Sequence, residues 1–140
     1  MKKLITLICA ALAFLAVPAA GNIGVGTAPF EVKINSCVYG SDEYPFLYYH
    51  DITYMPLTYD MCRFAGISLR DISDGYFISA SLPEISELSS QPAQVKSVTA
   101  QFPERPAYIM ENRLENYYRD ADYPVLMYNG IVYMPLTWHV

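Results

Sequence analysis

The sequence contains few of the side chains that most catalytic and metal-binding sites require. Its 140 residues include two histidines, three cysteines and one tryptophan. It contains no Gly-x-Ser-x-Gly, no His-Glu-x-x-His and no phosphate-binding glycine loop, which mark hydrolases, zinc peptidases and nucleotide-binding proteins. We therefore expect a chain that is not an enzyme and that carries no cofactor.

Metal ligands are equally sparse. Copper and zinc sites bring two or three imidazoles or thiolates together, whereas His139 stands next to the last residue and His50 lies in a turn-like dipeptide. A composite site of His50, Cys37 and Cys62 stays open as an alternative. The acidic stretch "ENYYRDADY" lacks the alternating oxygen ligands and central glycine of an EF-hand loop. The prediction is no metal.

Positive charge is also scarce. Nine lysines and arginines face fourteen acidic residues, and two of the nine are Lys2 and Lys3 at the extreme N-terminus. A chain without those two lysines has a net charge near −7. Such a surface does not attract nucleic acid or anionic lipid, so we expect neither as a partner.

Long hydrophobic runs are absent after the first twenty residues. Lys2 and Lys3 precede an unbroken apolar run over Leu4–Val17, and Val17 and Ala19 are small residues before a cleavage point. This is the pattern of a secretory signal peptide, residues 1–19. The alternative, a membrane anchor, needs about 20 apolar residues. We expect an exported mature chain, secreted or extracytoplasmic, with no membrane span.

Two cysteines remain after the signal peptide is removed, Cys37 and Cys62. In an exported protein this pair is a candidate disulfide, which would stabilise the fold by about 3 kcal/mol in the chain-entropy model. The alternative is two separate buried thiols that pack like small apolar residues. The sequence leaves both open.

The sequence does contain an internal repeat. Residues Tyr44–Thr58 align without a gap with Tyr123–Thr137, and ten of the fifteen pairs are identical. In the second copy the central dipeptide is Asn129-Gly130, which is typical of a two-residue β-hairpin turn. The repeat therefore predicts that His50-Asp51 is a hairpin tip as well.

The two faces of this hairpin differ between the copies. The face that is identical in both carries Leu47, Tyr49, Ile52 and Tyr54, which recur as Leu126, Tyr128, Ile131 and Tyr133. The opposite face changes at three of its four positions: Phe46, Tyr48 and Thr53 become Val125, Met127 and Val132, while Met55 recurs as Met134. We expect the identical face to pack on a fixed partner inside each unit, the helix that follows.

That helix is predicted over residues 59–65, with Thr58 as its N-cap and Gly66 as its terminator. The expected fold class is α+β, a small antiparallel hairpin sheet packed on a short helix, as a tandem repeat with the second copy truncated. The expected organisation after the signal peptide is a flexible leader over 20–29, a first repeat over 30–82, a Pro/Ser-rich linker over 83–106 and an incomplete second repeat over 107–140.

A short strand, an Asn-containing turn, a "YPxLxYxxIxYMPLT" hairpin and a helix ending in "RFAG" together resemble the copper amine oxidase N-terminal-like, or stalk, domain family of exported bacterial proteins. The resemblance covers 30–82 and, incompletely, 107–140. It implies a small α+β unit of cell-surface proteins. The copper and quinone chemistry of amine oxidases belongs to a different domain, so the resemblance implies no oxidase activity.

The expected function is therefore a non-enzymatic structural or interaction module of the cell envelope. The alternative is a module that binds cell-wall glycan or peptide through exposed Tyr48, Tyr117 and Tyr118. The second hairpin lacks the helix and strands that follow the first. Its face would then be a bare patch of Leu126, Tyr128, Ile131 and Tyr133, a surface for self-association. Either the chain belongs to a longer protein, or this half-unit docks on the first unit or on another chain.

Overall fold

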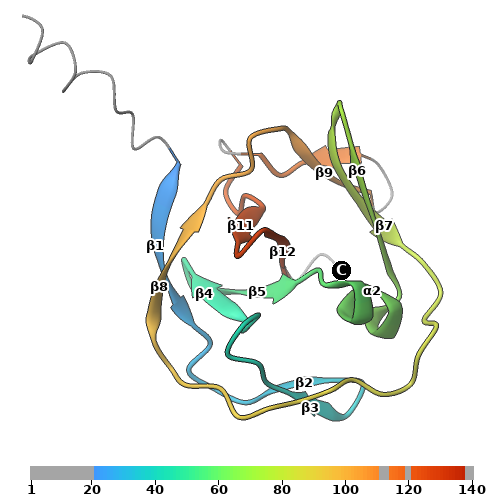
Figure 1. Cartoon of the computed structure of the whole chain (residues 1–140). Coiled ribbons are helices and arrows are strands. Elements are labelled where there is room, and N and C mark those ends of the chain that lie inside the picture. The colour runs from blue at the N-terminus through green and yellow to red at the C-terminus, as the bar shows by residue number, and fades with distance from the viewer. Residues whose placement is uncertain (1–20, 111–113, 119–120, 138–140) are drawn as a thin grey trace, which may run out of the picture.

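A computed structural model (Figure 1) describes residues 21–110, 114–118 and 121–137. The predicted signal peptide and His139 lie outside the described residues. The described chain is mostly β-structure. It forms a closed six-stranded barrel, an outer four-stranded sheet, a separate two-stranded hairpin and one short helix.

The barrel strands follow one another in the order β1-β4-β5-β12-β11-β8, and β8 closes the ring on β1. Their bounds are β1 Asn22–Thr27, β4 Leu47–Tyr49, β5 Ile52–Pro56, β8 Ser97–Gln101, β11 Leu126–Tyr128 and β12 Ile131–Pro135. The predicted fold class, α+β with a hairpin sheet on a helix in each repeat, is therefore wrong. Each copy supplies three strands to a single shared barrel.

The predicted hairpin tips are confirmed. Strands β4 and β5 pair with Tyr49 opposite Ile52, so His50 and Asp51 form the turn, at φ angles of 50° and 62°. In the second copy Asn129 and Gly130 have φ angles of 50° and 73°. Two consecutive residues with positive φ are what a type I′ turn requires, and this turn matches the twist of the strands it joins.

The two copies are related by an internal two-fold arrangement. Where β5 pairs with β12, Met55 lies opposite Met134, its own counterpart in the repeat. Where β1 pairs with β8, the central pair is Gly24 and Thr99. Both seams are antiparallel and centred on equivalent positions. The second half-unit therefore docks on the first within the chain, which was one of the predicted outcomes.

Two segments outside the predicted repeats form barrel strands. The predicted flexible leader contains β1, and the predicted linker contains β8, where the sequence suggests an edge strand from Val95 but the structure has a strand paired on both sides. Strand β1 pairs with both β4 and β8, so its backbone hydrogen bonds are made on two sides. The correction has a physical reason: long-range pairing overrides the weak local strand propensity of "NIGVGT".

The identical hairpin face does not pack on the helix as predicted. Leu47, Tyr54, Leu126 and Tyr133 are fully buried together in one core, with Val25 and Ala100 from β1 and β8. The partner of each identical face is thus the same face of the other copy, inside the barrel. This requirement of mutual fit accounts for the identity. The predicted bare patch at Leu126 and Tyr133 does not exist.

The changing face lies outside the barrel wall and forms a second core. Phe46, Met55, Val125, Val132 and Met134 are buried there with Met61 of the helix and Ile78 of the outer sheet. The helix over 59–65 occurs once among the described residues, so equivalent positions of the two copies do not meet the same neighbours on this side. Different neighbours require different side-chain shapes.

The helix α2 spans Tyr59–Ala65, as predicted. The Thr58 hydroxyl accepts a hydrogen bond from the Met61 amide at 3.2 Å, and Gly66 ends the helix at φ 72°. A Cβ at Gly66 would lie 2.9 Å from the Ser81 carbonyl oxygen, so the site requires glycine for space as well as for conformation.

The outer sheet has the order β10-β9-β7-β6, and its strands β6, β7 and β9 lie across the molecule from β1 and β8 (Figure 1). Its strands are β6 Ile67–Ile72, β7 Gly75–Ala80, β9 Ala107–Met110 and β10 Leu114–Asn116. Strands β7 and β9 come from different copies and pair in parallel. The two-stranded hairpin joins β2 Val32–Ile34 to β3 Cys37–Tyr39 through Asn35 and Ser36, both at positive φ.

Candidate functional site

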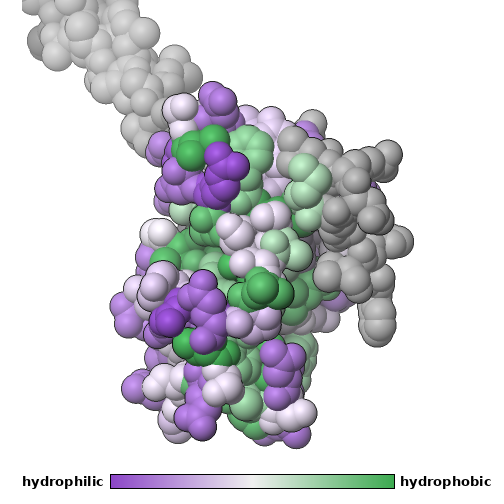
Figure 2. Space-filling model, turned by 90° about the vertical axis from the view of Figure 1, so that its right-hand side faces the viewer, coloured by the Kyte–Doolittle hydropathy of each residue, from purple (hydrophilic) through white to green (hydrophobic). Residues whose placement is uncertain are grey.

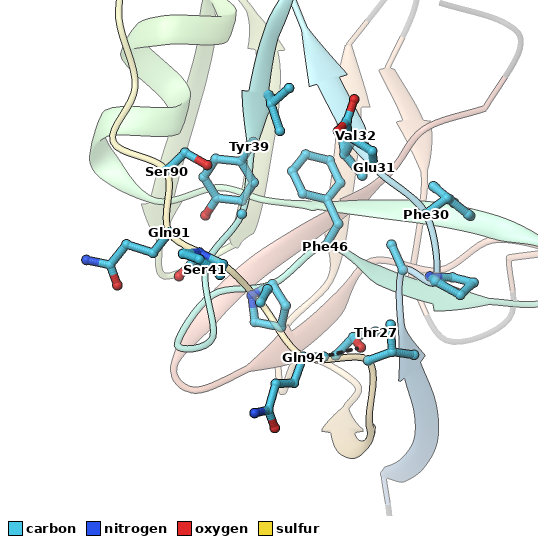
Figure 3. A pocket seen from close by; sticks show the side chains of 18 residues that line it. Thr27, Phe30, Glu31, Val32, Tyr39, Ser41, Phe46, Ser90, Gln91 and Gln94 are labelled. Carbon is cyan, nitrogen blue, oxygen red and sulfur yellow. Dashed lines mark hydrogen bonds between the residues drawn. The ribbon is translucent and has the colours of Figure 1, made fainter.

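A cleft of about 560 Å³ lies between the β2–β3 hairpin and the segment 90–95 (Figure 3). Three parts of the chain form it. Its lining residues are Thr27–Val32, Val38–Ser41, Pro45, Phe46 and Ser90–Val95. This volume is in the range of small-molecule sites.

The floor of the cleft is aromatic. Phe46 is buried, and its ring meets Tyr39 edge-to-face at 5.3 Å between centroids. The Tyr39 hydroxyl donates to the Tyr44 carbonyl oxygen at 2.9 Å, and burial raises the pKa of Tyr39 above its ordinary value. Phe30 stands at the rim with 49% of its surface exposed. An apolar floor of this kind favours flat or aliphatic groups of a ligand.

One wall of the cleft is the segment 90–96, which crosses the hairpin as a strap. The Gln91 amide donates to the Gly40 carbonyl oxygen at 2.8 Å, and the Lys96 amide donates to Thr27 Oγ1 at 2.9 Å. The Gln94 amide donates to Asp42 Oδ1 at 3.0 Å. A Cβ at Gly40 would lie 2.4 Å from the Gln91 carbonyl oxygen. The strap therefore depends on glycine at position 40.

The lining residues offer surface for binding a ligand but few groups for acid–base chemistry. Glu31 and Tyr39 are the only titratable side chains among them, and the Glu31 carboxylate is 3.2 Å from Lys33 Nζ in an exposed ion pair. The remaining polar groups are hydroxyls, amides and backbone. Sequence reasoning missed this cleft because the strap has no periodicity; the unexplained Gly40 beside the hairpin was the one local signal.

The three tyrosines predicted as an exposed glycan platform are half-buried and lie on two different parts of the chain. Tyr48 is half-buried in barrel strand β4, meets Phe30 edge-to-face at 5.8 Å, and donates to Asp51 Oδ1 at 3.2 Å. Tyr117 and Tyr118 follow β10 and are half-buried; Tyr117 packs on the second core and the Tyr118 hydroxyl donates to the Glu104 carbonyl oxygen. Of these three tyrosines, only Tyr48 lies beside the cleft, because it contacts the lining residue Phe30.

The remaining predicted residues are also placed. Tyr128 and Ile131 pack partly buried against the barrel core. Cys37 and Cys62 are free, half-buried thiols, so the candidate disulfide is not formed, and burial raises the pKa of the Cys62 thiol. His50 is exposed and stacks on Tyr49 at 3.8 Å. Within 21–110, 114–118 and 121–137, no three histidine, cysteine or carboxylate side chains gather as a metal site.

Arg105 is a residue that sequence reasoning did not single out. Its guanidinium lies over the Tyr76 ring, 4.5 Å from the centroid, and donates to Asp71, to the Tyr76 hydroxyl and to the Ile72 carbonyl oxygen. It therefore fastens the β6–β7 turn to the segment before β9. Its position between Pro103 and Pro106 gave no sign of this role.

Comparison with family models, with curated proteins and with solved structures finds no match to this chain. The helix α2, the one helix among the described residues, is far too short to cross a bilayer.

Proposed function

We propose that this protein is an exported structural or interaction module of the cell envelope, built from stalk-type repeats and working through the edges of its outer sheets. One observation carries the proposal: the barrel is closed, whereas β6 and β2 have unpaired outer edges among the described residues. Open strand edges present unpaired amides and carbonyls that add strands from partners. The N-terminal signal pattern and the resemblance to stalk domains support the envelope as the location.

The β6 edge has the chemistry that strand pairing needs. The Ser81 amide donates to the Gly66 carbonyl oxygen at 2.8 Å, which fixes the alternation of the β6–β7 ladder. The amides of Ile67, Leu69 and Asp71 then point away from β7. The side of the molecule that carries α2 and the outer sheet shows hydrophobic residues between polar ones (Figure 2). Its exposed apolar side chains include Ile72 and Met110.

Site-specific cross-linking in living cells tests this function. A photoreactive residue is placed at Ile72, at the end of the β6 edge, and in a matched control at His50, an exposed barrel turn. We expect the exported protein in the envelope fraction, with cross-linked products at position 72 and none at position 50. A protein found in the cytoplasm, or the same products from both positions, would contradict the proposal.

The cleft supports a second candidate, binding of a neutral cell-wall glycan or peptide. Its aromatic floor and its amide-rich strap favour an uncharged ligand with polar and flat faces. Titration calorimetry with muropeptide fragments tests it. Wild type should bind saturably, and Phe30→Ala should bind about tenfold more weakly, because Phe30 is half-exposed at the rim. Unchanged affinity in Phe30→Ala, or no binding by wild type, would exclude the cleft.

A further inference from the structure

The internal two-fold arrangement gives β2 and β9 equivalent places. Strand β2 follows barrel strand β1 and turns into β3, and β9 follows barrel strand β8 and turns into β10. Strands β1 and β8 are themselves equivalent, since they pair about the central Gly24–Thr99 pair. Counting outward from that pair, Glu31, Val32 and Ile34 correspond to Pro106, Ala107 and Ile109.

The two strands differ in one respect. Strand β9 has a second partner, β7, which pairs with it in parallel from Tyr76–Ala107 to Ser79–Met110. Strand β2 pairs only with β3 in the described part of the chain. The place beside β2 that corresponds to β7 is therefore open.

Side-chain burial records the same difference. Ala107 is fully buried and Ile109 is 8% exposed, whereas their counterparts Val32 and Ile34 are only half-buried. Phe30, next to β2, is 49% exposed. The apolar strip that β7 covers in the second copy is thus less covered in the first, where Val32 and Ile34 pack only partly against the second core.

The backbone beside β2 is also arranged to pair. Residues Ile34 and Cys37 close the two-residue turn as a facing pair, so alternation along the ladder points the amide and carbonyl of Lys33 away from β3. In the second copy the Tyr76 amide donates to the Pro106 carbonyl oxygen at 2.8 Å. The counterpart acceptor in the first copy is the Glu31 carbonyl.

We propose that the outer edge of β2 is a strand-acceptor site that binds an extended polypeptide segment in parallel, as β9 binds β7. This inference rests on the proposed interaction function and names one site and its ligand. The bound segment begins with glycine, by analogy with β7: a Cβ at Gly75 would lie 2.3 Å from the carbonyl oxygen of Pro106, the counterpart of Glu31. An inward aromatic and an inward aliphatic residue follow, as Tyr76 and Ile78 do in β7.

The occupant is a strand of a separate polypeptide. In a folded copy of this chain, β7 already pairs with β6 on one side and with β9 on the other, so it has no edge to offer. A β7-like segment in a partner protein has no such restriction. Main-chain hydrogen bonds then supply affinity, and the two inward side chains supply specificity.

Nuclear magnetic resonance titration of the labelled mature chain tests the site. The probe is the peptide of residues 74–81, "DGYFISAS", and the control is "DGFYSIAS", which has the same composition but exchanges its two faces. We expect saturable shifts at the amides of Lys33 and its neighbours with the first peptide only. Sedimentation should show a monomer throughout; a dimer would identify a second copy as the occupant and overturn the inference.

A pair of variants separates pairing from folding. Lys33→Pro removes the amide that points outward, and it breaks no ladder hydrogen bond because that amide does not bond to β3. Lys33→Gln keeps the amide. The first should bind the peptide about tenfold more weakly and the second as wild type. Equal binding by both, or shifts confined to β6 or the cleft, would contradict the inference. If position 72 still cross-links in cells in that event, the interaction function stands and only the β2 site is lost.

Discussion

At the residue scale, the barrel core contains two polar groups without a partner. The hydroxyls of Tyr54 and Tyr133 are buried and make no hydrogen bond to the described residues. The two tyrosines are counterparts in the repeat, so the same feature occurs once in each copy. An unpaired buried hydroxyl costs about 1–3 kcal/mol.

Removing these hydroxyls should therefore stabilise the protein. Tyr54→Phe and Tyr133→Phe each keep the ring that fills the core and delete the unpaired oxygen. We expect each to raise the free energy of unfolding by about 1 kcal/mol, measured by urea denaturation. Tyr48→Phe is the matched control, because its hydroxyl does have a partner in Asp51. A loss of stability in the core variants would reveal a hydrogen-bonded water or ligand inside the barrel.

The same residues predict how stability depends on pH. Burial raises the pKa of Tyr54 and of Tyr133 above the ordinary value of 10.0. The unfolded chain therefore releases these protons first as the pH rises, and stability present below pH 10 falls above it. Urea denaturation between pH 8 and 11 should show this decline, and the double phenylalanine variant should show a smaller one. An equal decline in both proteins would mean that other groups cause it.

At the element scale, short irregular segments do more than connect strands. The strap over 90–96 is bonded to the β3 end, to Asp42 and to Thr27, and it makes one wall of the cleft. Arg105 similarly ties the β6–β7 turn to the chain before β9. Elements with little regular structure thus hold the outer parts of the molecule to the barrel.

The strap gives a sharp test at Gly40. Gly40→Ala places a Cβ 2.4 Å from the Gln91 carbonyl oxygen, so the strap must move away. We expect a loss of about 1–3 kcal/mol in the free energy of unfolding and faster hydrogen exchange at the Gln91 amide. Gly24→Ala is the matched control, since a Cβ there meets nothing within 4 Å. Similar effects of the two substitutions would contradict the described strap.

At the scale of the whole molecule, the repeat builds one interlocked barrel. Local features were predictable from the sequence: the His50-Asp51 and Asn129-Gly130 turns, and the helix between Thr58 and Gly66, follow from side-chain chemistry at adjacent residues. The barrel was not predictable, because β1 pairs with β8 far along the chain and neither strand has a strong sequence pattern. The cleft was not predictable either, because it is formed by three segments that only the barrel brings together.

The central claim is that the two copies share one core, and hydrogen exchange tests it most directly. Leu126→Val removes one methylene from the second copy at a fully buried position of the barrel core. It should lower the opening free energy by about 1 kcal/mol. If the copies interlock, amides of β5 in the first copy should lose as much protection as amides of β12 in the second. Loss of protection in β11 and β12 alone, with β5 unchanged, would contradict the shared barrel.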